Sequence, residues 1–235
     1  MAVRMPLTVT SLAEFLVQIK NWSGTEVLLQ AGGSCSGKSA LALELATARH
    51  CDVIHGDDWA LPARDVLPRN LPFGFESPEA YDLAGLGEAI TCLLSKGWCE
   101  KPVFDFTRDC VVRTEVLHRT GGLLVVEFLH AFHPAVREAL KAKRARLVWL
   151  DADVRVRLMR RLKRDLSARG KLLREVTREW QVVLAAERKY FGEYRTEADL
   201  LFHDPTQLAR EECSRLIEAS EATPEERSEL LAFFA

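Results

Sequence analysis

The sequence predicts an α/β protein in which a mostly parallel sheet is covered by helices on both faces. Short apolar runs of strand length alternate with longer stretches of helical periodicity, an order that is typical of parallel sheets. The most apolar of these runs, GGLLVVEFL at 121–129, has no charge before its glutamate, as expected for a strand buried on both sides. The length of 235 residues suits one such domain, so residues 1–235 are expected to fold as a single unit.

The elements of the first half begin with a helix at 11–22. Ser11 and Glu14 form a capping box there, ahead of apolar residues at helical spacing. EVLLQAG predicts a buried strand, and the good helix formers of SALALELATARH predict the helix after it. CDVIHGDD predicts a second strand that ends in two acids. Residues 60–78 are proline-rich and aperiodic, so a long loop is expected before EAYDLAGLGEAITCLLSKG returns to helix.

The second half repeats the alternation. EKPVFDFT predicts an edge or hairpin strand outside the main sheet, and GGLLVVEFL, HPAVREALKAK and ARLVWLDA predict strand, helix and strand. Residues 152–190 are helical and rich in arginine, with a break near Gly170. The C-terminal part, 206–235, predicts two more helices as an appendage. The apolar side of the last one can pack on the domain or on a second copy of the chain, which leaves a homo-oligomer open.

Composition excludes several function classes. The net charge of -2 argues against a strongly basic nucleic-acid binder. No apolar run approaches the ~20 residues of a membrane helix, and the N-terminus lacks the apolar core of a signal peptide. The 6 cysteines show no metal-ligand spacing, so they are interpreted as reduced thiols. A cytoplasmic protein without nucleic-acid or membrane partners is expected.

A phosphate-binding loop is predicted at 32–39, where the sequence matches G-x-x-x-x-G-K-[ST] at every fixed position. The strand before it and the helix after it supply the context that this pattern requires. Backbone N–H groups of such a loop surround a polyphosphate at a helix N-terminus. Lys38 would reach the β- and γ-phosphates of ATP, and Ser39 would bind Mg²⁺. The remaining loop residues predicted to contact the nucleotide are Gly32, Gly33, Ser34, Cys35, Ser36 and Gly37. The alternative, a plain strand-to-helix turn with a solvated Lys38, is disfavoured by this context.

Three acids follow strands that converge on the loop. Carboxyl ends of parallel strands meet at one edge of the sheet, which places Asp57 and Asp58 beside the phosphates. One of them could accept a proton from a substrate hydroxyl, although paired acids also cap turns. Glu127 ends its strand as a Walker B acid does and would hold Mg²⁺, with helix capping as the alternative.

A basic stretch, RVRLMRRLKRDLSARGKLLR, concentrates positive charge in a nearly neutral protein. Arg157, Arg161 and Arg164 share one helix face by their spacing. Two interpretations compete: a solvated helix paired with acids, or a lid at about 155–175 whose arginines close on the phosphates of ATP. The preceding phosphate loop favours the lid.

The order of these motifs resembles the uridine kinase-like group of P-loop kinases, which includes phosphoribulokinase and nicotinamide riboside kinase, over residues 27–204. The resemblance implies the P-loop fold, ATP and Mg²⁺. HGDDW stands where uridine-cytidine kinases have Q-D-S-F-Y, which places Asp57 on the catalytic base. LVVEFLHAF matches V-L-x-E-G-I-L-x-F and supports Glu127. RRLKRDLSARGK matches R-R-x-x-R-D-x-x-x-R-G-R, which implies substrate and phosphate contacts for Arg161 and Arg164 and a lid role for Arg169 and Lys171.

The same resemblance implies the acceptor site. FGFESPEAYDL is similar to N-F-D-H-P-D-A-F-D, which places Phe75 on a nucleoside-contacting aromatic and Glu76 on a ribose-holding acid. PVFDFT is similar to P-x-Y-D-F. Further implied substrate contacts are Phe104, Phe106, Asp109 near a base-reading histidine, and Arg113.

The departures from the family pattern concentrate in this acceptor site. Ala60 replaces a tyrosine, Phe104 replaces a tyrosine, and Phe128 replaces the glycine after the Walker B acid. The phosphoryl-transfer residues are kept while the base-reading residues differ, which favours an acceptor other than uridine or cytidine.

The sequence therefore predicts an ATP- and Mg²⁺-dependent kinase acting on a hydroxyl of a small nucleoside- or sugar-like molecule. Asp57, Lys38, Arg161 and Arg164 are the predicted catalytic residues, and Ser39 and Glu127 the predicted metal side. A P-loop ATPase that serves as a regulatory or binding module is the alternative from another class.

Overall fold

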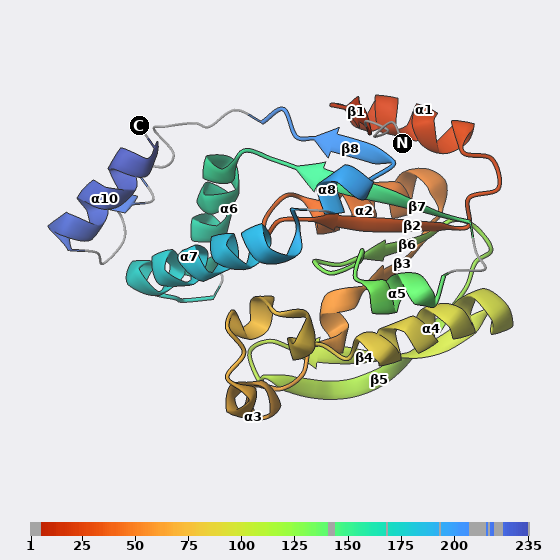
Figure 1. Ribbon diagram of the computed structural model, residues 1–235, viewed down its shortest axis with the longest axis horizontal. Coiled ribbons are helices and arrows are strands. Elements are labelled where there is room, and N and C mark those ends of the chain that lie inside the picture. The colour runs from red at the N-terminus through yellow and green to blue at the C-terminus, as the bar shows by residue number, and fades with distance from the viewer. Residues whose placement is uncertain are drawn as a thin grey trace.

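A six-stranded sheet forms the centre of the computed structural model, in the order β1-β8-β7-β2-β6-β3 (Figure 1). Every pairing in it is parallel. The strands are β1 Leu7–Val9, β2 Val27–Gly32, β3 Asp52–His55, β6 Leu124–Glu127, β7 Ala145–Asp151 and β8 Leu200–His203. The structure describes residues 6–140, 144–167, 169–192, 194–206, 215, 217–218 and 223–234. The predicted parallel α/β fold is confirmed.

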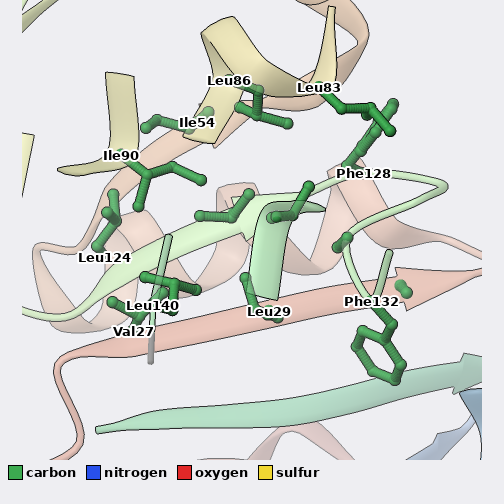
Figure 2. Close-up of a cluster of buried hydrophobic side chains, with 14 of the residues drawn as sticks. Val27, Leu29, Ile54, Leu83, Leu86, Ile90, Leu124, Phe128, Phe132 and Leu140 are labelled. Carbon is green, nitrogen blue, oxygen red and sulfur yellow. The ribbon is translucent and has the colours of Figure 1, made fainter. Parts of the chain in front are cut away.

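Helices cover both faces of this sheet. On one face lie α1 (Leu12–Asn21), capped by the Ser11 side chain as predicted, and α2 (Lys38–Arg49), which bury Phe15 and Leu45 against the strands. On the other face lie α4 (Leu83–Lys96) and α5 (Pro134–Glu138). Figure 2 shows side chains of α4 gathered over strands β2, β3 and β6. The expected three layers are therefore present.

A two-stranded antiparallel hairpin lies outside the main sheet, packed along α4 (Figure 1). It consists of β4 (Trp98–Asp105), which was expected as a hairpin or edge strand, and β5 (Cys110–His118), which was not. Strands β1 and β8 were missed as well, because they have only 3 and 4 residues; β1 stands at the edge of the sheet and β8 lies next to it. Sequence periodicity cannot resolve elements that short.

The segment 60–78 is more ordered than the loop that was expected. It contains one short helix, α3 (Ala63–Val66), and three 3₁₀ turns, at Leu67–Arg69, Gly74–Glu76 and Pro78–Ala80. Its prolines, which suggested irregular structure, open these turns: Pro62 precedes α3 and Pro78 starts the last one. Proline suits such starts because its fixed φ is preset for a helical turn.

The arginine-rich stretch forms two helices that pack together, α6 (Val154–Ser167) and α7 (Leu173–Tyr190), with the predicted break at Gly170. A short α8 (Tyr194–Glu197) follows α7. The last helix, α10 (Pro224–Phe234), buries Leu230 and Phe234 in the same cluster as Trp180 of α7. Most of the helix expected at 205–220 lies outside the described residues. No helix in the described part of the chain is long and apolar enough to span a membrane.

Candidate active site

The loop between β2 and α2 has the backbone conformation of an anion-binding turn. Cys35 and Gly37 have φ angles of 61° and 99°, and the left-handed residue Gly37 leads directly into α2. A Cβ on Gly33 would overlap Nη1 of Arg157, so a larger residue there would require the Arg157 guanidinium to shift. The N–H of Ser34 donates to Oε1 of Glu187 at 3.1 Å, so helix α7 holds this loop from outside. Because Gly37 leads directly into α2, the positive N-terminal end of this helix lies at the loop.

Lys38 is the first residue of α2, and its ammonium group is folded back over the loop. Nζ donates to the carbonyl oxygens of Gly32 and Gly33 at 3.0 and 3.1 Å. The backbone of Lys38 is fixed by strand β2, where Nε2 of the buried Gln30 donates to the Lys38 carbonyl oxygen at 2.6 Å. The lysine charge is therefore held at the mouth of the loop, within reach of a phosphate seated there.

Glu127 and Ser39 lie together on the side of the loop predicted to hold the metal. Burial alone would raise the pKa of Glu127, but the hydrogen bond from His55, the charge of Lys38 and the Ser39 hydroxyl hold it below its usual value. Nδ1 of His55 lies 2.9 Å from the Glu127 carboxylate. An ionised carboxylate beside a hydroxyl is a donor set that suits Mg²⁺, which typically takes one or two carboxylates and fills its shell with phosphate oxygens and water.

The structure separates the two neighbouring aspartates. Both lie in a 3₁₀ turn (Gly56–Trp59) just after β3, not within the strand as expected. Asp58 forms an ion pair with Lys101 of the hairpin at 2.8 Å, while Asp57 opens onto the cavity beside the loop. Although Asp57 is open to the cavity, desolvation by the surrounding protein, together with the Glu127 charge, raises its pKa to about 6 in spite of the nearby Lys38. Geometry and basicity both favour Asp57 as the proton acceptor.

Arginines of α6 form the opposite wall. Arg161 donates to the Ser34 hydroxyl at 3.3 Å and to Glu179 at 2.7 Å. Arg160 reaches the Cys35 carbonyl at 3.4 Å. The fully buried Asp165 contacts Arg161, Arg164 and Arg169 at 3.3, 2.7 and 3.4 Å. Positive groups are thus gathered over the loop by a few carboxylates, which is the arrangement that a phosphoryl-transfer site needs.

These groups enclose a cavity of about 770 Å³. From the predicted site it brings together thirteen residues, namely Ser34, Cys35, Gly37, Lys38, Ser39, Asp57, Phe75, Glu76, Phe106, Glu127, Arg161, Arg164 and Arg169. Lys171, expected in the lid, also lines it. The volume suits a nucleotide with a small second molecule.

Other predicted site residues lie outside the lining of this cavity. Phe104 is buried and packs on Phe106 with ring centroids 4.9 Å apart. Asp109 accepts a hydrogen bond from the Ala63 N–H at 2.7 Å, and Arg113 pairs with Glu115 on the exposed hairpin. Gly32, Gly33 and Ser36 form the back of the loop. Phe104, Asp109 and Arg113 are thus placed to shape the hairpin and the turn next to it.

Several lining residues were missed from the sequence. Phe73, Tyr81 and Leu129 line the cavity near Phe75 and Glu76, and Arg160 and Glu179 line it from α6 and α7. Phe73 and Tyr81 lie within FGFESPEAYDL, and Arg160 is the first residue of RRLKRDLSARGK, so their place in motifs that the family resemblance picked out was the available signal. Glu179 gave none, because it stands on α7 and is brought in by helix packing.

The acceptor side of the cavity is acidic and aromatic. Glu76 lies between Asp57 and Arg161, with the Arg161 guanidinium 3.9 Å away. Burial raises the pKa of Glu76, and the Arg161 charge opposes that shift. Phe75 and Phe106 present exposed rings beside it. Carboxylates next to aromatic rings favour hydroxyl-bearing acceptors that carry no negative charge.

Comparisons with known proteins identify a family for this chain. The phosphoribulokinase/uridine kinase family profile matches residues 60–208. A uridine kinase of Alkaliphilus metalliredigens (strain QYMF) is 27% identical over 167 residues, which covers 69% of this chain and 78% of that protein.

Solved structures share the fold. A candidate fructose transport system kinase from Silicibacter sp. TM1040 matches with a TM-score of 0.68 at 21% identity, over 83% of this chain and 100% of that one. Phosphoribulokinase from Rhodobacter spheroides matches with a TM-score of 0.57 at 15% identity, over 77% of this chain and 70% of that one. The family profile spans more than half of the sequence, and the chain belongs to the phosphoribulokinase/uridine kinase family.

Proposed function

We propose that this protein is an ATP- and Mg²⁺-dependent kinase that transfers the γ-phosphate to a hydroxyl of a nucleoside- or sugar-like acceptor. The observation that carries the proposal is that one cavity is lined by the phosphate loop, by Asp57 and by the arginines of α6. A donor site, a base and a set of cations that neutralise charge are the parts that phosphoryl transfer requires.

In the proposed reaction the acceptor hydroxyl approaches the γ-phosphorus beside Asp57. The new bond joins the acceptor oxygen to phosphorus, the bond from the γ-phosphorus to the β–γ bridging oxygen breaks, and ADP leaves. Asp57 takes the hydroxyl proton. Lys38 and the loop N–H groups hold the phosphates, and Arg161, Arg164 and Arg169 stabilise the charge on the migrating group. Ser39 and Glu127 would hold Mg²⁺, which neutralises phosphate charge when bound.

The composition of the acceptor side favours an uncharged polyol. Two carboxylates, Asp57 and Glu76, accept hydrogen bonds from hydroxyls and repel anions, while Phe75 and Phe106 offer surfaces for a ring. A phosphorylated sugar would place a second phosphate against these acids. The relatives named for uridine and fructose suggest the first acceptors to try.

The test is a panel of acceptors with ATP and Mg²⁺: uridine, cytidine, nicotinamide riboside, D-fructose and pantothenate, with ADP release and product mass as readouts. Asp57→Asn should lower the rate on the accepted compound roughly 10²- to 10⁴-fold and leave ATP binding intact. Asp58→Asn is the matched control, because that carboxylate faces Lys101 and not the cavity. It should keep a rate near that of the wild type.

Two outcomes would overturn the proposal. ATP binding without phosphorylation of any compound in the panel would support the regulatory ATPase instead. A wild-type rate in Asp57→Asn would remove the base. Misfolding is excluded as a cause by thermal denaturation: at pH about 8 the Asp57→Asn substitution should raise the melting temperature, because an ionised carboxyl with a raised pKa opposes folding above that pKa.

A further inference from the structure

Tyr81 places a polar group in the acceptor side of the cavity that the proposed reaction does not yet use. It lines the cavity together with Asp57 and Glu76, and the charges of both carboxylates act on its phenol. No residue in the described part of the chain forms a hydrogen bond with its hydroxyl. Tyr81 is partly buried and lines the cavity, so its hydroxyl is available to a ligand bound there.

The ring of Tyr81 is held by packing. It meets Phe128 edge-on with centroids 4.9 Å apart and His130 at 5.7 Å, and both of these partners are fully buried. Phe128 in turn fills the space over Gly56, where a Cβ would overlap its ring. Burial lowers the pKa of His130 to about 3, so this partner stays neutral. The position of the hydroxyl is therefore set by the core and does not depend on the ligand.

The backbone ties Tyr81 to the turn that carries Asp57. Leu61 N–H donates to the Ala80 carbonyl at 2.9 Å, and Asp82 N–H donates to the Trp59 carbonyl at 2.9 Å. Tyr81 itself pairs with Ala60 in an antiparallel bridge. Directly opposed residues in such a pair point to the same side, and the small Ala60 leaves that side free for the phenol. The hydroxyl and the proposed base are thus parts of one rigid unit.

Tyr81 also supplies the chemistry that the acids lack. Ionised carboxylates only accept hydrogen bonds, so Asp57 and Glu76 can bind the protons of a polyol but not its oxygen lone pairs. Arg161, the nearby donor, is engaged by Glu179 and Asp165. Burial and the two carboxylates raise the pKa of Tyr81 well above its usual value, so its hydroxyl stays protonated and able to donate.

We propose that Tyr81 is a specificity-determining residue, whose hydroxyl donates a hydrogen bond to an oxygen of the acceptor next to the hydroxyl that is phosphorylated. The inference rests on the proposed function for the location of the acceptor. It predicts a polyol with at least two neighbouring oxygens, one on Asp57 and one on Tyr81, as in a ribose or a ketose.

The test is calorimetric binding of uridine and of D-fructose to the full chain in the presence of Mg²⁺ and a non-hydrolysable ATP analogue. Tyr81→Phe, which removes one oxygen and keeps the ring, should weaken the probe that binds about tenfold, the usual effect of one lost hydrogen bond. Binding of the ATP analogue and the melting temperature should not change. Tyr190→Phe is the matched control, because its ring also packs on His130 but does not line the cavity.

A second arm identifies the oxygen. If uridine binds, either 2′-deoxyuridine or 3′-deoxyuridine should bind the wild type about tenfold more weakly than uridine does. Tyr81→Phe should bind that same deoxy compound as tightly as it binds uridine. For fructose the corresponding deoxy sugars serve. The inference is overturned if Tyr81→Phe binds the probe like the wild type, if both deoxy losses persist in Tyr81→Phe, or if neither probe binds. A probe that binds through Tyr81 but is not phosphorylated would instead overturn the proposed kinase function alone.

Discussion

Gly56 and Phe128 stand at two positions where the sequence departs from the uridine kinase pattern, and the structure joins them. The pattern has glutamine at the first position and glycine at the second, whereas here the small residue precedes Asp57 and the large one follows Glu127. Phe128 occupies the volume over Gly56 that any side chain there would need. The two substitutions therefore compensate each other and keep Asp57 and Glu127 in place.

The raised pKa of Asp57 predicts a pH dependence at the residue scale. Because the carboxyl must be ionised to accept a proton, kcat/KM for the acceptor should rise as the pH passes through about 6 and level off above it. Initial rates over a range of pH at saturating ATP measure this. Binding of the ATP analogue over the same range is the control for the donor side. A flat profile through this range would contradict the assignment of Asp57.

At the element scale, the single carboxylate of Asp165 organises the arginines of α6. It is fully buried, and burial alone would raise its pKa, but the hydrogen bond from Arg164 and the three guanidinium charges hold the pKa below its usual value. Glu179 on α7 holds Arg161 and Lys171 in the same way. In this helix pair, the carboxylates of Asp165 and Glu179 thus hold the positive side chains that line the cavity.

Asp165→Asn should therefore weaken catalysis, although Asp165 itself does not line the cavity. With the central charge gone, the three arginines lose their common partner, and we expect KM for ATP to rise at least tenfold (about 1.4 kcal/mol) and kcat to fall. Steady-state kinetics with varied ATP measure both. Asp153→Asn, an exposed acid that precedes α6, is the matched control. Unchanged ATP kinetics in Asp165→Asn would show that the arginines are placed by packing alone.

At the scale of the whole molecule, the buried side chains form three hydrophobic clusters. Two of them pack against the two faces of the sheet, and the third lies outside the sheet. The third cluster unites α6, α7 and α10 around Trp180. The cavity is lined by the phosphate loop on one side and by arginines of α6 on the other, and α6 packs into this third cluster. The last helix thus packs on its own domain, and Phe234 is 3% exposed.

Phe234→Ala should loosen that outer cluster. Truncation of a buried phenylalanine typically costs about 3–5 kcal/mol, and here the loss falls on the helices that carry the arginines. We expect a lower melting temperature together with a higher KM for ATP. Phe233→Ala is the matched control, because its neighbouring ring is 38% exposed, and it should change stability by less than about 1 kcal/mol. Equal effects of the two truncations would mean that α10 does not support the helices that carry the arginines.

Much of this architecture could be predicted because it depends on local pattern. The buried strand and glycine-rich turn before Lys38 have signatures in consecutive residues, and so do the capped α1 and the break at Gly170. Strands β1 and β8 were missed because they are short and pair with strands far along the chain. Strand β5 pairs with the neighbouring β4, but most of its residues are exposed, so it lacks the buried face that gives a strand its alternation.

The candidate site likewise has features that local sequence predicts and features that only the folded chain shows. The fold class, the phosphate loop and the basic stretch could be specified from the amino-acid sequence, because each follows from the spacing of neighbouring residues. The folded chain was needed to show that Asp57 faces the cavity while Asp58 pairs with Lys101, and that Tyr81 and Glu179 join the lining. Those outcomes depend on which side chains are brought together by turns and helix packing across the sheet edge, and contacts between distant residues leave no local pattern.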